Sequence, residues 1–90
     1  MKEIIFDSSH IQSIDQLHAE LARSLDFPEH YGRNLDALYD CLNGEIALPL
    51  KFIWQNYRLT QLKLGKDAAK VLQVMEDFSD DEPDFIIEVE

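Results

Sequence analysis

The sequence predicts an α/β domain in which about four helices pack against a three-stranded parallel sheet. Three apolar runs with strand character lie near residues 2–6, 50–54 and 84–89, and segments with helical apolar spacing separate them. Strands that are joined by helical crossovers pair in parallel, with right-handed connections. The chain has 90 residues, of which 46% are hydrophobic, and this is enough for one core. We therefore expect residues 1–90 to form a single domain.

The first strand and the first helix are expected before Pro28. The apolar run at residues 4–6 is typical of a strand buried on both faces. Ser13 is followed three residues later by Gln16, the pattern of a capping box, in which each side chain satisfies a backbone N–H of the other residue. Apolar residues at helical spacing then predict a helix over residues 14–26. Pro28 ends it, because the residue before a proline avoids helical backbone angles.

A loop at residues 27–33 is expected to lead into a second helix. Asn34 is a good N-cap for this helix, because its side-chain oxygen can accept from a free backbone N–H in the first turn. Gly44 fits the stop at the other end. The second helix is therefore predicted over residues 34–44.

The second half of the chain is expected to supply the two remaining strands and two more helices. Residues 50–54 read as a strand, and residues 55–64 as a short helical or turn-rich stretch that Gly65 closes. Apolar residues at helical spacing make residues 67–79 the clearest later helix. Residues 84–89 form the last strand.

The helix at residues 34–44 is expected to carry an acidic face. Asp36 and Asp40 stand one turn apart, and at ~100° per residue they share a narrow arc with Asn43, with Tyr39 beside them. The apolar side chains fall on the opposite side: Leu35, Leu38, Cys41 and Leu42. Like charges one turn apart destabilise an isolated helix, so this face indicates a negative surface presented to a positive partner.

The charge of the whole chain favours the same kind of partner. The formal net charge is -10, with 18 acidic and 8 basic residues. The stretch from residue 76 to residue 90 contains no Lys or Arg and eight acids: Glu76, Asp77, Asp80, Asp81, Glu82, Asp84, Glu88 and Glu90. Such a field repels nucleic acid and anionic lipid and attracts basic proteins. The other interpretation is that the acids only keep the protein in solution.

Metal binding and catalysis are not expected. His10, His18, His30 and Cys41 lack the close spacing of a zinc site, so we interpret the histidines as surface or loop residues and the cysteine as a small core residue. A general acid–base pair would need burial to separate two carboxyl pKa values, which an exposed helical face does not provide. We predict no cofactor, no metal and no enzyme activity.

The N-terminus and the single cysteine indicate a location in the cytoplasm. Cys41 can form no disulfide within the chain, which fits a reducing compartment. The first residues contain too short an apolar run for a signal peptide, and no segment is long and apolar enough to span a membrane. The protein is therefore expected to be cytoplasmic, without a membrane partner.

The segment from Pro28 to Leu42, PEHYGRNLDALYDCL, resembles the signature of the barstar family, intracellular inhibitors of the ribonuclease barnase. Its core, Tyr-Gly-x-Asn-Leu-Asp-Ala-Leu-x-Asp-Cys-Leu, is long and ungapped. The resemblance continues through Trp54 and Val71 to the last strand and covers essentially the whole chain. The fold that it implies, three parallel strands with four helices, is the one that the residue patterns predict.

The resemblance implies inhibition by charge mimicry, in which the second helix and the loop before it enter the active-site cleft of the ribonuclease in place of RNA. Asp40 matches the carboxylate that lies where a substrate phosphate would bind, and Asp36 matches a contact to basic residues at the cleft edge. Gly32 and Asn34 match contacts of the loop and the helix start. From the last helix, Asp77 matches an acid that reaches a basic side chain of the nuclease, with Asp81 as a rim charge.

Four positions depart from the family pattern. His30 replaces a phenol, Tyr39 and Glu45 replace tryptophans, and Arg33 replaces an acid. These positions lie where specificity is set, so the target is a barnase-like or a different nuclease, or another basic protein. Scaffold roles are expected for Tyr31, Leu35, Leu38 and Trp54. The expected partner-binding residues are His30, Gly32, Arg33, Asn34, Asp36, Tyr39, Asp40, Asn43, Gly44, Glu45, Asp77 and Asp81.

The leading hypothesis is a monomer that binds a basic ribonuclease or related nuclease toxin one to one and blocks its active site, protecting the producing cell. The alternative is an acidic protein-binding module that docks a different basic partner. An acid–base hydrolase using Asp36 and Asp40 is the enzyme class to exclude.

Overall fold

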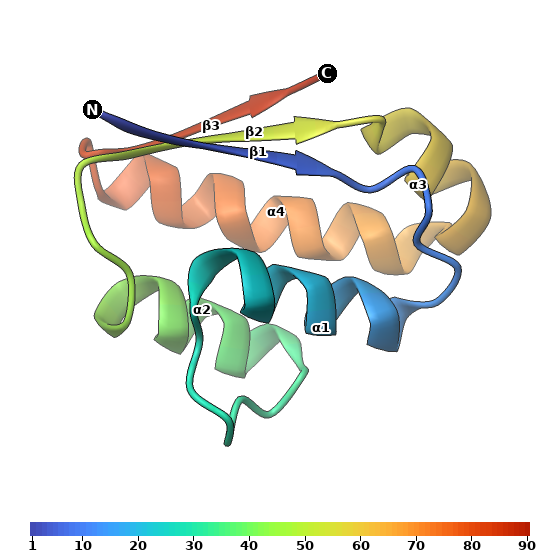
Figure 1. The fold of residues 1–90 in the computed structure, drawn as a ribbon, viewed down its shortest axis with the longest axis horizontal. Helices are drawn as coiled ribbons and strands as arrows, with labels where there is room; N and C mark the ends of the chain where they lie inside the picture. The colour runs from blue at the N-terminus through green and yellow to red at the C-terminus, as the bar shows by residue number, and fades with distance from the viewer.

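Three parallel strands form the sheet of the computed structural model, which describes residues 1–90, and the helices lie on one side of that sheet (Figure 1). The elements in chain order are β1 (Lys2–Asp7), α1 (Ile14–Leu25), α2 (Leu35–Gly44), β2 (Leu50–Gln55), α3 (Tyr57–Leu64), α4 (Lys66–Asp81) and β3 (Phe85–Val89). The predicted fold class is therefore confirmed, and each predicted element is found within two residues of its expected ends.

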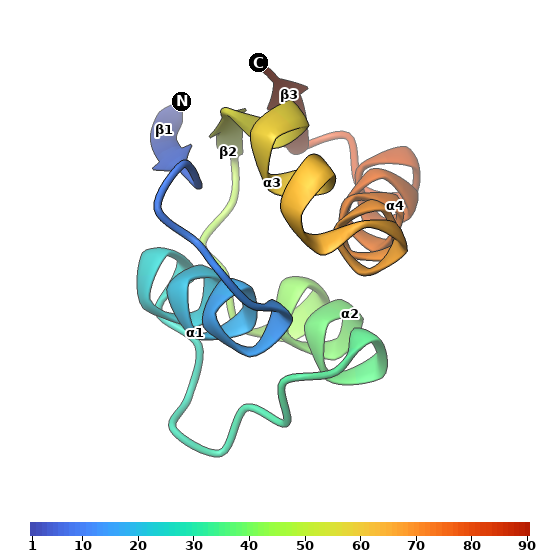
Figure 2. The same ribbon diagram turned by 90° about the vertical axis from the view of Figure 1, so that its right-hand side faces the viewer.

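The central strand β2 organises the core. The strand order is β1-β2-β3, with Phe6 of β1 opposite Trp54 and Phe85 of β3 opposite Leu50. Leu50, Phe52 and Trp54 alternate along β2 and all point into the core, where they are fully buried. Helices α1, α2 and α4 bury their apolar stripes in this one core, and Figure 2 shows from the end of the sheet that all three lie on the same side of it.

The expectation that β1 is buried on both faces is wrong. Phe6 is buried, but its neighbour Ile5 is 63% exposed, and Ile86 of β3 is 41% exposed. Successive side chains of a strand point to opposite faces, and no helix covers the second face of this sheet. The centre of this open face is Ile53, which lies between Ile5 and Glu88 in register and keeps only 8% of its surface exposed.

Helix α1 begins as predicted at Ser13, but the capping box is not reciprocal. The Ser13 Oγ accepts from the Gln16 backbone N–H at 3.0 Å. The Gln16 side chain reaches one residue further back and accepts from the Gln12 N–H at 2.8 Å.

One helix end agrees with the prediction, and one differs in a way that matters for the acidic surface. Gly44 is the last residue of α2, as predicted, and Glu45 follows it with ordinary backbone angles and no left-handed residue. Helix α4 runs to Asp81 instead of ending near Ser79, so Asp81 is a helical residue. One extra half-turn therefore carries Asp81 on the same rigid element as Asp77.

Candidate partner-binding surface

Helix α2 begins in the geometry that the sequence predicts. The Asn34 side chain accepts from the Ala37 N–H at 2.8 Å, which satisfies a free donor of the first turn, and its own amide donates to the Gly32 carbonyl at 3.3 Å. Leu38 and Leu42 are fully buried and hold the helix on the core. Asn34 thus fixes both the start of the helix and the end of the loop before it.

The acidic face of α2 points away from the core. Asp36, Asp40 and Asn43 are all exposed. None of the four ion pairs of the structure includes Asp36 or Asp40, and neither side chain takes part in a hydrogen bond within the protein. Both carboxylates are therefore free to accept hydrogen bonds from another molecule.

The loop before α2 and the side of that helix enclose a hollow of about 230 Å³. It is lined by Pro28, His30, Tyr31, Gly32, Ala37, Asp40, Cys41 and Glu45. Four of the predicted partner-binding residues, His30, Gly32, Asp40 and Glu45, therefore meet at one concave place. The hollow contains two carboxylates and no Lys or Arg, so it favours a cationic side chain.

A buried hydrogen bond supports this loop from beneath. Tyr31 Oη lies 2.7 Å from Nδ1 of His18 on α1, and the Tyr31 ring packs on Phe27. Burial lowers the pKa of His18 and raises the pKa of Tyr31, so the bond joins a neutral imidazole and a protonated phenol. Tyr31 is therefore a scaffold residue, as expected.

The interpretation of His18 as a surface or loop histidine is wrong, because it is only 4% exposed. It lies four residues after Ile14 and three before Leu21, on the apolar stripe of α1. That spacing is the signal that could have identified a buried histidine. The apolar spacing of α1 does not identify Tyr31 as the hydrogen-bond partner of His18, since Tyr31 lies beyond the end of that helix.

Arg33 supplies a second tie between this loop and α1. It adopts a left-handed backbone conformation with φ 51°, and its Nη1 donates to Oδ2 of Asp15 at 2.9 Å. Both side chains are more than half exposed, so the pair adds little stability. Arg33 does not line the hollow beside Asp40.

The end of α4 extends the acidic face next to α2. The Tyr39 hydroxyl donates to Oδ2 of Asp81 at 2.9 Å, and Asp77 accepts from Gln73 Nε2 on its own helix at 2.9 Å. Asp77 and Asp81 are both exposed. The Tyr39–Asp81 hydrogen bond thus links the exposed side of α2 to the end of α4.

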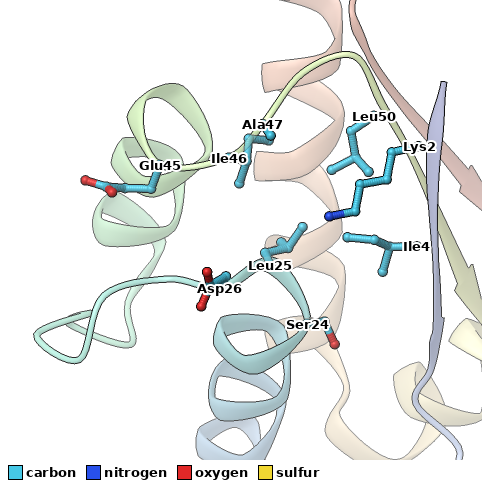
Figure 3. Close-up of a pocket in the computed structure, with 9 residues that line it drawn as sticks. All are labelled: Lys2, Ile4, Ser24, Leu25, Asp26, Glu45, Ile46, Ala47 and Leu50. Carbon is cyan, nitrogen blue, oxygen red and sulfur yellow. The ribbon is translucent and has the colours of Figure 1, made fainter.

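A second hollow lies beyond the C-terminal end of α2 and differs in character (Figure 3). It encloses about 160 Å³ between the ends of α1 and α2 and the first residues of β1 and β2. The aliphatic side chains of Ile4, Leu25 and Leu50 face it, and the Lys2 amine extends across it, whereas the Glu45 carboxylate points away. Among the predicted residues only Glu45 borders it.

Cys41 is buried, and burial raises the pKa of its thiol, so it stays protonated as a core residue. No group of three or more His, Cys, Asp and Glu side chains is placed to hold a metal ion. None of the helices combines the length and the apolar character needed to cross a membrane.

Comparison with known proteins gives two findings. Residues 1–90 match the family model described as Barstar (barnase inhibitor). The chain is also 44% identical over 77 residues to a protein of Bacillus subtilis (strain 168) named "Putative ribonuclease inhibitor YrdF", an alignment that covers 86% of this chain and 85% of that protein.

Proposed function

The chain belongs to the barstar family, and on this premise we propose that it inhibits a basic ribonuclease by filling the active-site cleft with α2 and the loop before it. The resemblance seen along residues 28–42 is thereby confirmed as a family relationship. The observation that carries the proposal is the state of Asp40, an exposed carboxylate without a partner in the protein, on the rim of a concave surface.

Charge complementarity gives the proposal its physical basis. A cleft that holds RNA must present cations to the phosphates, so a carboxylate at a fixed position can take the place of a phosphate. Removing the Asp40 carboxylate from water costs free energy, and this cost is offset only if cations of the enzyme contact the carboxylate closely. Because no cation of this chain neutralises Asp36 or Asp40, no internal ion pair has to break first.

The hollow beside Asp40 suits a protruding basic side chain of the enzyme. Its volume of about 230 Å³ exceeds that of one side chain, and Asp40 and Glu45 both border it. His30 and Gly32 form the loop side of the hollow, so an imidazole or guanidinium would lie between the loop and the helix. The rigid support of this loop by His18 and Tyr31 reduces the conformational entropy lost on binding.

The remaining features of the proposal follow from inhibition by occlusion. One inhibitor covers one cleft, so the complex is one to one and the chain needs no catalytic group of its own. Such an inhibitor acts where the nuclease would do harm, in the cytoplasm of the producing cell, against its own enzyme or a related toxin.

Asp40→Ala tests the mechanism, with Glu3→Ala as the matched control. Glu3 is an exposed acid on β1, far in the sequence from α2, and its removal changes the net charge by the same amount. Inhibition of a basic ribonuclease from the producing organism should weaken about a hundredfold or more in Asp40→Ala, because the enzyme's cations stay buried without their partner. Glu3→Ala should change it by no more than about twofold.

Equal inhibition by the wild-type chain and Asp40→Ala would exclude phosphate mimicry. A wild-type chain that inhibits no ribonuclease, yet binds another basic protein through α2, would replace this function with that of an acidic docking module. The departures at His30, Arg33, Tyr39 and Glu45 make that second outcome worth measuring directly.

A further inference from the structure

Two residues of helix α4 contact Tyr39, one at its hydroxyl and one at its ring. Its hydroxyl donates to Oδ2 of Asp81 at 2.9 Å, and its ring meets the Phe78 ring edge-on, with 5.8 Å between centroids. Phe78 is itself buried and packs on Phe85 of β3. A chain of contacts therefore runs from the core, through Phe78, to a partly buried ring on the outward side of α2.

Asp81 differs from the other acids of this surface. Asp36, Asp40 and Asp80 are exposed and form no hydrogen bond within the protein, whereas one oxygen of Asp81 is already used by Tyr39. A carboxylate that already accepts a hydrogen bond from a phenol has less acceptor capacity left for a cation of another protein. We propose that Asp81 is a positioning residue, which acts on partner binding by fixing the Tyr39 ring and not as a free charge at the rim.

The benefit of this arrangement is preorganisation. A tyrosine that is free to rotate loses conformational freedom when a partner covers it, and a ring already fixed between Phe78 and Asp81 avoids that loss. The same contacts join α2 to α4. The inference rests on the proposed function only for its effect on binding, since the contact itself belongs to the free protein.

The chemistry of the phenol agrees with the geometry. The hydrogen bond to Asp81 raises the pKa of Tyr39, and partial burial and the charges of Asp81 and Asp77 raise it further. The groups that face the hydroxyl are therefore acids from α4. The phenol stays protonated and remains a donor at neutral pH.

The contact can be tested without a partner by following the tyrosine ring carbons by NMR during a pH titration. Tyr39→Phe identifies the Tyr39 signal among the three tyrosines. In the wild-type protein the pKa of Tyr39 should lie above the ordinary value of about 10, and in Asp81→Ala it should fall toward that value. Asp80→Ala, which removes an exposed neighbouring acid, should leave it nearly unchanged. An ordinary pKa in the wild-type protein would overturn the proposal.

The effect on binding is tested by a double-mutant cycle against the inhibited ribonuclease. Asp81→Ala should weaken inhibition about two- to tenfold in the wild-type background and much less in a Tyr39→Phe background. Asp81→Asn, which keeps an acceptor oxygen for the phenol, should retain more inhibition than Asp81→Ala. An equal loss from Asp81→Ala in both backgrounds would identify a direct rim charge and overturn the proposal.

These outcomes remain distinct from those of the proposed function. A wild-type chain without any ribonuclease inhibition would reject that function, while the phenol pKa would still decide whether Asp81 holds Tyr39.

Discussion

At the scale of single residues, buried polar contacts determine the position of exposed groups on the candidate partner-binding surface. His18 and Tyr31 are both buried and satisfy each other, and Tyr31 lies between His30 and Gly32 in the loop before α2. Neither side chain needs to touch a partner to affect binding, because the loop depends on their contact for its position. No buried side-chain polar atom is left without a hydrogen bond in this structure.

The His18 contact predicts a pH-dependent stability. Burial lowers the pKa of His18 in the folded protein, so the unfolded chain binds the proton more tightly. Its contribution to stability is present above the unfolded pKa of about 6.5 and is lost as the pH falls through the lower folded value. Urea unfolding between about pH 7.5 and about pH 5.5 should show a smaller fall in unfolding free energy for His18→Gln than for the wild-type protein.

Tyr31→Phe is the companion variant for this measurement. It removes the hydrogen bond but keeps His18 buried, so it should lower the unfolding free energy by about 1–3 kcal/mol at neutral pH and keep the part of the pH dependence that burial causes. The same pH dependence in His18→Gln and in the wild-type protein would show that His18 does not contribute to it.

At the scale of elements, the glycines at two helix ends have opposite roles. Gly65 joins α3 to α4 with φ 64° and ψ -136°, a conformation that side chains rarely adopt. Gly44 is the last helical residue of α2 and has open space where a Cβ would lie. The sequence alone suggests a helix stop at both positions, but only Gly65 requires a glycine.

A pair of alanine substitutions tests this difference. Gly65→Ala should lower the unfolding free energy by about 1–3 kcal/mol through backbone strain. Gly44→Ala should leave it unchanged or raise it by up to about 1 kcal/mol, because alanine loses less conformational entropy than glycine in a helix. Urea denaturation of both variants measures the two changes, and an equal loss in both would contradict the assignment of strain to Gly65.

At the scale of the whole molecule, the helical side and the open face of the sheet expose different kinds of side chain. The exposed acids of α2 and of the end of α4 belong to the helical side, whereas the open face of the sheet carries exposed isoleucines and the Lys51–Glu88 ion pair. The formal net charge of -10 adds a long-range attraction for a basic enzyme. Steering of this kind acts on the rate of encounter more than on the lifetime of the complex.

Salt should therefore slow the association of the chain with its ribonuclease. The screening length shortens from about 10 Å at 0.1 M salt to about 3 Å at 1 M, so the association rate measured by stopped-flow fluorescence should fall steeply over this range. Asp36→Asn should lessen the dependence on salt more than Glu3→Gln, because Asp36 lies on the proposed contact face. An association rate that does not respond to salt would contradict electrostatic steering.

The sequence by itself determined the order of the elements, the outward acids of α2 and the family, because periodicity, caps and an ungapped motif are properties of continuous segments. Only the tertiary structure decided that β1 has an open face, that Gly44 ends its helix without a left-handed turn, and that His18 is buried. It also joined Tyr39 to Asp81, 42 positions apart, and His18 to Tyr31, 13 positions apart. Such contacts depend on how elements pack against one another, and no local pattern of residues encodes that packing.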